Sequence, residues 1–321
     1  MKYALLVVAG GILFGTTGTA RALAPDSAGS TSVGLVRLTF GGLLFGLLGL
    51  VMYLKRRRSA PEGPTPPHPR PWLKRAPACL AVVICAASIL VYQDTFFVGT
   101  MANGVMVGTV VALGSSPLFA GVFEWIVLRR RPGLIWLAAT VICVAGMVAL
   151  SGVLSSAHST VSVSGLAHSL IAGACYAVLA VGSKWLLQRG WTALDTAVAT
   201  MATGAVMAVV PMLRTDLSWL REPRGVAVAA WLAVATIVIA FLLNVTGLTH
   251  TPASTVTTLN LSEPATASVL GVVVLGEAMT LLRALGIAAV AAGVLLLGLT
   301  TRDASGGATT PRAEAAPSEQ G

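Results

Sequence analysis

Ten long apolar blocks divide this chain, and they constrain its fold more than any other feature. Each block has about 20 residues with almost no charge, the length an α-helix needs to cross ~30 Å of hydrocarbon at ~1.5 Å per residue. The blocks run near Tyr3–Leu23, Val33–Leu54, Ala76–Phe97, Thr100–Leu128, Gly133–Ser151, Gly165–Leu187, Leu194–Leu213, Val226–Thr246, Pro252–Leu275 and Leu281–Leu299. In lipid each block must be helical, because unpaired backbone groups are too costly there.

Composition excludes the other broad classes. Only 10% of the residues are charged, against about 25% in a typical soluble domain. A soluble enzyme, a secreted disulfide scaffold and a disordered chain are therefore excluded, and a β-barrel is disfavoured because the blocks do not alternate with period two. Four cysteines lie inside apolar blocks without metal-ligand spacing, so we expect buried packing residues and neither a metal nor a cofactor.

The net charge of +9 suggests nucleic acid at first, but its distribution indicates membrane topology. The basic residues lie in short connections between blocks and not along one amphipathic face. With the N-terminus in the cytoplasm, basic runs such as Lys55–Arg58 and Arg129–Arg131 fall on the inner side, as the positive-inside rule requires. We expect a multi-pass inner-membrane protein whose partners are the bilayer and a small solute, with both termini cytoplasmic.

Two segments carry no apolar block. The connection 55–75 is basic and rich in proline, so we expect a solvated, polyproline-like cytoplasmic linker. The tail 300–321 has no apolar period, and we expect it to be disordered in the cytoplasm. The first block also permits a different interpretation, a signal peptide cleaved near Ala20–Ala24, which would leave nine helices and remove the repeat described next.

The chain contains an internal repeat. The spacing of Ser115, Pro117 and Ala145-Gly146 recurs at Ser262, Pro264 and Ala292-Gly293. Residues 1–152 and 164–299 therefore read as two copies of a five-helix unit. Since each copy has an odd number of helices, the second must enter the membrane in the opposite orientation. The predicted fold is an all-α integral membrane protein, with ten transmembrane helices as a 5+5 inverted repeat and the substrate site between the copies.

Short motifs then give a specific resemblance. The second half carries Leu261-Ser262-Glu263-Pro264-Ala265, Leu275-Gly276-Glu277, Leu285-Gly286 and Ala292-Gly293-Val294. The first half carries Phe14-Gly15, an early Arg37 in the second block and Ser116-Pro117-Leu118. From Tyr3 to Leu299 the chain resembles EamA-type transporters of the drug/metabolite transporter superfamily. The sequence departs from this family at Arg130. This residue occupies the first-half position equivalent to Glu277, where the family often has an acid.

The resemblance implies a carrier that moves small organic solutes by alternating access, often an exporter of amino acids or metabolites. It does not imply an enzyme, and the absence of a P-loop in the sequence excludes ATP-driven transport by this chain. The alternative is a polytopic membrane sensor or assembly protein without transport activity. The expected function is therefore export of an amino-acid-like or drug-like metabolite, with proton coupling as an option.

Charged residues inside the blocks are the main candidates for the chemistry. A charge at the bilayer centre costs about 2.5–3.5 kcal/mol on insertion scales, so few are tolerated without a partner or a wet cavity. Glu263 near the middle of the ninth block and Asp94 in the third could bind a substrate amine or exchange a proton. The alternative for Glu263 is a structural role, as a buried acid that is hydrogen-bonded to Ser or Thr or paired with an arginine. Arg37 could bind a substrate carboxylate, pair with Asp94, or extend to the interface.

Polar and aromatic neighbours complete the candidate pathway. Pro264 removes the helical hydrogen bond to the carbonyl of Asn260, and Asn260 and Glu263 share one helix surface. Thr257 adds a hydroxyl, although such hydroxyls also bond their own helix. Phe14 and Tyr176 are candidate lining residues, or else packing groups. Pro117 and Pro264 are the predicted helix breaks.

Overall fold

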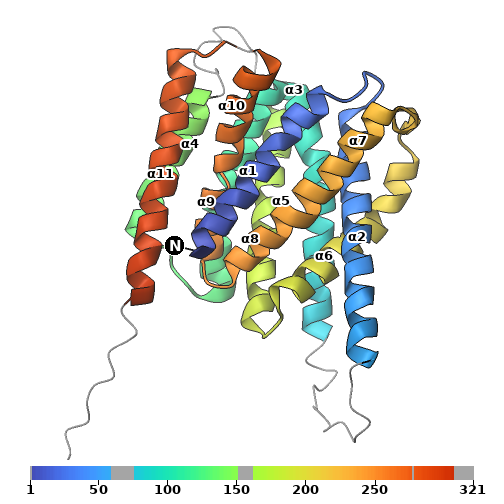
Figure 1. Cartoon of the computed structure of the whole chain (residues 1–321). Helices are drawn as coiled ribbons and strands as arrows, with labels where there is room; N and C mark the ends of the chain where they lie inside the picture. Colours follow the sequence, from blue (N-terminus) through green and yellow to red (C-terminus); the bar gives the residue numbers. More distant parts are fainter. Residues whose placement is uncertain (1, 59–75, 151–161, 277, 307–321) are drawn as a thin grey trace, which may run out of the picture.

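The computed structural model of this chain is an all-helical bundle (Figure 1) and describes residues 2–58, 76–150, 162–276 and 278–306. The first half consists of α1 (Lys2–Ala22), α2 (Ser30–Arg58), α3 (Ala76–Leu128) and α4 (Leu134–Leu150). The second half consists of α5 (Val163–Gln188), α6 (Ala193–Leu213), η3 (Ser218–Arg221), α7 (Pro223–Trp231), η4 (Leu232–Ile239), α8 (Ala240–Leu248), α9 (Ala253–Leu259), α10 (Ser262–Leu275) and α11 (Leu281–Gly306).

These elements give ten crossings among the described residues. Nine segments are long and apolar enough to span a membrane, and α4 (Leu134–Leu150) is a shorter apolar helix between two of them. α3 supplies two crossings, α7 to α8 form one, and α9 with α10 form another. The starting end of α1 and the final end of α11 lie toward the same side of the bundle (Figure 1), as an even number of crossings requires.

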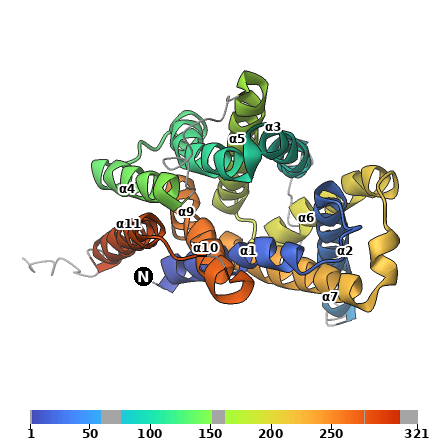
Figure 2. The same ribbon diagram turned by 90° about the horizontal axis from the view of Figure 1, so that it is seen from above.

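Helix pairing follows the two-fold pattern of a repeated unit. α1, the first helix of one half, packs on α8 and α10, whereas α5, the first helix of the other half, packs on both arms of α3. α2 packs on α6, and α4 packs on α11. Viewed from above, the α4–α11 and α2–α6 pairs lie at opposite ends of the bundle (Figure 2). The second and fifth helices of each copy thus meet their counterparts, as expected for a 5+5 arrangement.

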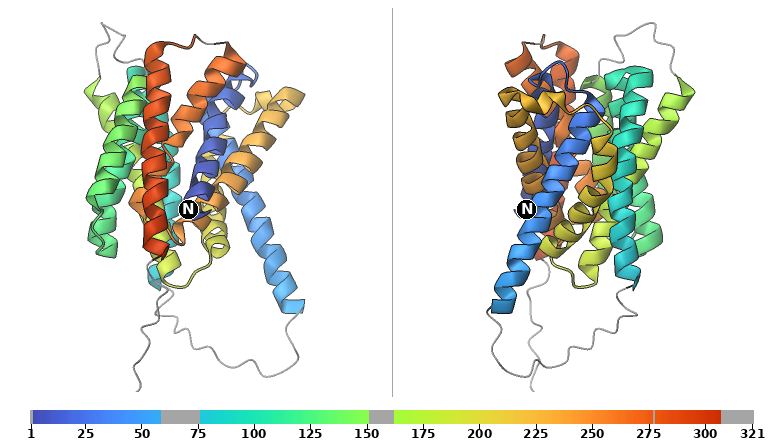
Figure 3. Two further views of the ribbon diagram at one scale, coloured as in Figure 1. Left: turned by 60° about the vertical axis from the view of Figure 1, so that its left-hand side comes forward. Right: turned by 90° about the vertical axis from the view of Figure 1, so that its right-hand side faces the viewer.

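Several predicted boundaries need correction or stay untested. α2 continues to Arg58, so the basic run Lys55–Arg58 belongs to a helix that extends beyond its neighbours at one end (Figure 3). The rest of the predicted linker, residues 59–75, lies outside the described residues, as do Glu277 and the tail residues 307–321. α11 reaches Gly306, past the predicted start of the tail at residue 300.

The first half bends at a glycine and not at its proline. Within α3 the non-helical residue is Gly104, with φ 81° and ψ 152°, a conformation open to glycine because it has no Cβ. The predicted break at Pro117 is wrong, since the helix runs through it. The missing proline N–H is replaced at the carbonyl of Leu113, which accepts a hydrogen bond from the Ser116 hydroxyl at 2.8 Å.

The second half is interrupted in two places. Residues 232–239 form a π-helix, a rare geometry that often marks functional sites. The ninth crossing divides at Asn260–Leu261, one turn before Pro264, into α9 and α10. There the carbonyl of Asn260 accepts the N–H of Glu263 at 2.9 Å. Loss of the helical bond at Pro264, expected from the sequence, therefore does not leave this carbonyl free, because a tighter turn already pairs it.

Glycines bring α1 close to the interrupted helices. A Cβ on Gly10 would collide with Asn244 in α8, and one on Gly11 would collide with Ser262 in α10. Absence of side chains at these positions lets the backbones approach, the usual way membrane helices pack. This approach places α1 directly beside the residues that enclose the central cavity.

Candidate functional site

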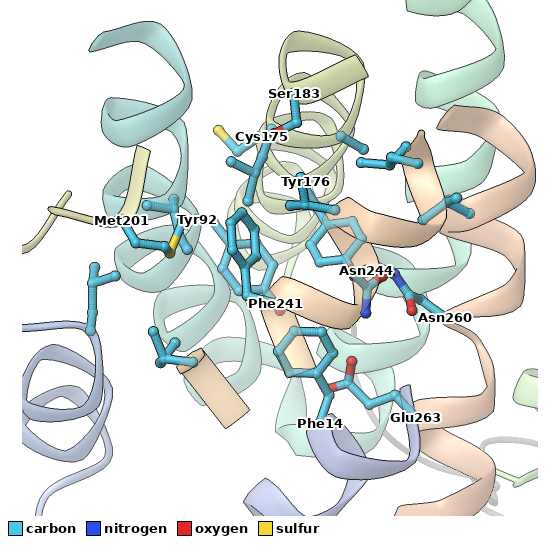
Figure 4. A pocket seen from close by; sticks show the side chains of 18 of the residues that line it. Phe14, Tyr92, Cys175, Tyr176, Ser183, Met201, Phe241, Asn244, Asn260 and Glu263 are labelled. Carbon is cyan, nitrogen blue, oxygen red and sulfur yellow. Dashed lines mark hydrogen bonds between the residues drawn. The ribbon is translucent and has the colours of Figure 1, made fainter. Parts of the chain in front are cut away.

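A cavity of about 80 Å³ lies between the two halves. That volume is enough for several water molecules. Its walls come from every helix of the bundle except α4, η3, α7 and α11 (Figure 4). The side chains that carry chemical groups or aromatic rings into the wall are Phe14, Arg37, Tyr92, Gln93, Cys175, Tyr176, Ser183, Phe241, Asn244, Asn260 and Glu263.

Glu263 presents its carboxylate to this cavity. It lies in the first turn of α10, just after the break in the ninth crossing, and lines the cavity together with Phe14 of α1 (Figure 4). Within the described part of the chain its carboxylate accepts no hydrogen bond and forms no ion pair within 4.0 Å. A helix start favours negative charge, but the side chain is left free to bind a ligand.

Arg37 faces the same cavity from α2. Its Nη1 donates to the Thr17 hydroxyl and its Nη2 to the amide oxygen of Gln93, both at 3.3 Å. Both partners are uncharged, and Nε is buried without a partner. Among the described residues no carboxylate lies within 4.0 Å of the guanidinium. The cavity wall therefore carries one basic and one acidic side chain that do not pair with each other.

An amide network fixes the wall next to Glu263. Nδ2 of Asn244 donates to the carbonyl of Ala240 at 3.2 Å, so its Oδ1 must face Asn260. Nδ2 of Asn260 donates to that oxygen at 2.6 Å and to the Tyr176 hydroxyl at 2.9 Å. Asn260 thus joins α8, the helix break and α5. Tyr92 extends the aromatic wall, with its ring centroid 5.9 Å from that of Tyr176.

Two predicted site residues lie elsewhere. Asp94 is exposed on the outside of α3 and is absent from the cavity wall. Consecutive helix residues point about 100° apart, so the wall receives Gln93 in its place, and the predicted Arg37–Asp94 pair is wrong. Thr257 is buried, but its hydroxyl donates to the carbonyls of Ala253 and Ser254 within its own helix. Neither residue is brought to the cavity.

The other predicted residues are brought together. Phe14, Arg37, Tyr176, Asn260 and Glu263 all line the cavity. Their role in binding stays a prediction. Residues that the sequence interpretation missed include Gln93, Ser183 and Phe241. A polar residue in an apolar block is the one signal that could have pointed to Gln93 and Ser183.

Two buried charged side chains, Glu124 and Lys184, bind the facing ends of α9 and α8. Glu124 accepts the N–H and hydroxyl of Ser254 at 2.9 and 2.6 Å, and Lys184 donates to the carbonyls of Leu248 and Thr249. The acid thus caps the start of α9 and the base caps the end of α8, each matching the charge of that helix end. In the described chain no group of His, Cys, Asp and Glu is arranged to hold a metal.

Comparisons with known proteins point to transporters. The EamA-like transporter family matches residues 1–152 and 163–299. The uncharacterized transporter YwfM of Bacillus subtilis is 34% identical over 94% of this chain and 95% of its own length. The threonine/homoserine exporter RhtA of Escherichia coli is 30% identical over 63% of this chain and 65% of its own. One solved crystal structure covers 94% of this chain and 98% of its own, with a TM-score of 0.73 at 19% identity, which speaks for the fold alone.

Proposed function

Since the chain belongs to the EamA-like transporter family, we propose that it exports a small zwitterionic solute of amino-acid type by alternating access, in exchange for protons. The observation that carries this proposal is the cavity, whose wall contains both Arg37 and Glu263 without a pairing between them. A buried charge without a partner is costly, so a ligand that supplies both opposite charges is the one that fits best.

The two charges select the substrate class. The guanidinium of Arg37 would bind the substrate carboxylate by a forked, charge-assisted contact. The carboxylate of Glu263 would bind the substrate ammonium. An amine without a carboxylate would leave Arg37 uncompensated, and a hydroxy acid without an amine would leave Glu263 uncompensated. Recognition of both groups would therefore discriminate against either monovalent analogue.

Uncharged groups in the wall suit a polar side chain on the substrate. The hydroxyl of Ser183 is buried and has no hydrogen-bond partner among the described residues, and it belongs to a cavity-lining residue. A substrate hydroxyl would provide that partner. RhtA, whose name gives threonine and homoserine as substrates, is a distant relative of this chain, and both amino acids carry such a hydroxyl. Hydroxylated amino acids are the first substrates to test.

Proton coupling would follow from competition at one carboxylate. Glu263 can hold either the substrate ammonium or a proton, but not both. Uptake of a proton from one side would release the substrate there, and loss of the proton on the other side would restore the substrate site. The exchange needs each end of the cavity to open in turn, which the inverted repeat permits by movement of one half against the other.

The substrate test is a flux assay with purified protein in proteoliposomes. The panel contains threonine, homoserine, the amine made by decarboxylating threonine, and the hydroxy acid that lacks the amine. We expect accumulation of the two amino acids under a proton gradient and at least tenfold slower movement of both analogues. Equal rates for all four would contradict the two-charge site, and movement of none would contradict export of this solute class.

We further propose that both termini lie in the cytoplasm of a cell with an inner membrane. Arg129–Arg131 and the end of α5 would then lie on the cytoplasmic side, in agreement with the distribution of basic residues. A reporter enzyme that is active only outside the cytoplasm, fused after Gly321, is expected to be inactive, whereas fusion within the α6–α7 connection is expected to give activity. The reverse pattern would place the termini outside.

A further inference from the structure

A second hollow lies on the outer surface of the bundle, and it shares no lining residue with the charged cavity. We name it the α3–α4 groove. It has a volume of about 490 Å³ and is lined along the end of α3 by Leu118, Gly121, Val122 and Trp125 and along the start of α4 by Arg131–Leu134, Trp136 and Leu137. From these residues we propose that the groove binds an anionic phospholipid, with an acyl chain in the hollow and the headgroup phosphate at Arg129–Arg131.

The wall of the groove matches a hydrocarbon chain. Most of its residues are aliphatic or aromatic, and its only charged lining residue is Arg131. Leu134 is 84% exposed and Trp125 is 49% exposed, so the apolar wall faces the bilayer and not a protein neighbour. Gly121 leaves space for the indole of Trp136, which we call the floor of the groove, because a Cβ on Gly121 would come within 2.7 Å of that ring.

The rim of the groove matches a phosphate. Arg129, Arg130 and Arg131 are all exposed, and among the described residues no carboxylate lies within 4.0 Å of any of them. Glu124, the nearby acid in sequence, is buried and bonds Ser254 instead. The guanidinium of Arg131 lies 5.2 Å from the ring centroid of Trp125, an arginine–tryptophan pair that suits the level of lipid headgroups.

Local backbone geometry gathers positive charge at this point. Arg129 ends α3 with φ 56°, the left-handed conformation that usually falls to glycine at a helix end. A non-glycine residue in that conformation is uncommon and costs energy. Residues 130–133 then lead the chain into α4, whose first N–H groups carry the positive end of the helix dipole. Arg131 lines the groove, and Arg129 and Arg130 directly precede it in the chain.

Hydrogen bonds connect the groove to α9, the first half of the interrupted ninth crossing. Trp136, its floor, donates from the indole Nε1 to the Thr258 hydroxyl at 3.1 Å, and Thr140 contacts the same hydroxyl at 2.9 Å. Thr258 lies in α9, two residues before Asn260. A lipid bound against Trp136 would therefore hold α4 against α9, whose Val256 lines the central cavity.

Native mass spectrometry of the full chain tests the proposal without any transport assay. Detergent-purified protein is mixed with equal amounts of phosphatidylglycerol and phosphatidylcholine of identical acyl chains. We expect at least fivefold more bound phosphatidylglycerol than phosphatidylcholine. The R129Q/R130Q/R131Q variant is expected to lose this preference. Variant R189Q is the matched control, because Arg189 is an exposed arginine stacked on Trp185 at the same end of the bundle, with 3.3 Å to the ring centroid.

A second variant tests the hollow with all charges kept. A Cβ on Gly133 would meet no atom within 4 Å. Gly133→Leu therefore adds an apolar side chain to the wall of the groove, and it is expected to lower bound phosphatidylglycerol at least threefold. Soluble glycerol phosphate in excess is expected not to displace the lipid. The lipid site would be overturned by equal retention of the two lipids or by full binding of phosphatidylglycerol to G133L. Displacement by glycerol phosphate would also overturn it, because that result indicates a site for a free phosphate. This experiment measures lipid binding alone, so a negative result would not contradict the export proposal. A negative flux assay would likewise not contradict the lipid site.

Discussion

The carboxylate of Glu124 in the first half accepts two hydrogen bonds from Ser254 in the second half, at 2.9 Å from the backbone N–H and 2.6 Å from the hydroxyl. The contact joins α3 to the start of α9, beside the buried ammonium of Lys184 at the end of α8. Because it crosses between the two copies, we expect it to separate if the two halves move apart on the side of Arg129–Arg131. It is thus both a stabilising contact and a candidate gate.

Loss of the Ser254 hydroxyl should weaken this closure. Hydrogen bonds to charged groups contribute about 1.5–3 kcal/mol, and a buried charge left short of a partner costs a similar amount. We expect Ser254→Ala to lower the stability of the detergent-purified protein by about 1–3 kcal/mol in thermal or denaturant unfolding. Ser164→Ala, at an exposed position on α5, is the control and should unfold as the wild type does.

We also expect Ser254→Ala to open the cavity on the side where Glu124 and Ser254 meet. Cys175 is a free thiol that lines the cavity, so its reaction with a water-soluble thiol reagent reports access. In a C79A background, which removes the exposed Cys79, we expect S254A to react at Cys175 several times faster than the parent from the side of Arg129–Arg131. An unchanged rate would mean that Glu124–Ser254 is a structural contact and no gate.

Glu263→Gln tests the proposed proton exchange. The amide keeps the size of the side chain but cannot release a proton or balance an ammonium charge. Proton-driven flux of threonine is therefore expected to fall at least tenfold and to lose its dependence on the imposed pH gradient. Asp94→Asn is the matched control, because Asp94 is an exposed acid outside the cavity wall, and its flux should stay within twofold. Proton-driven flux by E263Q would refute the exchange mechanism.

Variants of Asn260 and Thr257 compare a cavity-lining residue with a nearby residue whose hydroxyl bonds only within α9. Asn260→Ala leaves the Asn244 amide oxygen and the Tyr176 hydroxyl without their shared donor, and we expect about 1–3 kcal/mol of destabilisation together with slower flux. Thr257→Val removes only bonds within α9, so flux should stay within twofold. Equal flux defects in both variants would place Thr257 in the pathway after all.

Two glycines of α1 give a test of close helix packing. A methyl group at Gly10 would meet Asn244 and the Ala240 carbonyl, whereas one at Gly18 would meet nothing within 4 Å. Gly18→Ala is expected to leave stability unchanged or to raise it by about 0.5–1 kcal/mol through helix propensity. Gly10→Ala should instead push α1 from α8, lower the unfolding temperature and reduce flux. Similar behaviour of the two variants would show that this contact is loose.

The number and type of crossings could be predicted from the sequence, since an apolar run of about 20 residues has one stable solution in lipid. The doubled motif around Pro117 and Pro264 likewise pointed to two five-helix copies, and the pairing of α2 with α6 and α4 with α11 agrees with it. Glu263 and Arg37 were found because charge is rare in such runs. These properties depend on local composition and length, which the linear order of residues contains.

Which way each polar side chain faces was decided by the tertiary structure. One helical step of about 100° separates Gln93 in the cavity wall from Asp94 outside it, and uniformly apolar blocks give no period from which to choose between them. The equivalent prolines behave differently for the same kind of reason. At Pro117 the Ser116 hydroxyl pairs the Leu113 carbonyl and the helix continues, whereas the helix before Pro264 divides at Asn260–Leu261, where Asn260 finds partners on two other helices. Local sequence determines which groups need partners, but only the packed bundle determines which partners they meet.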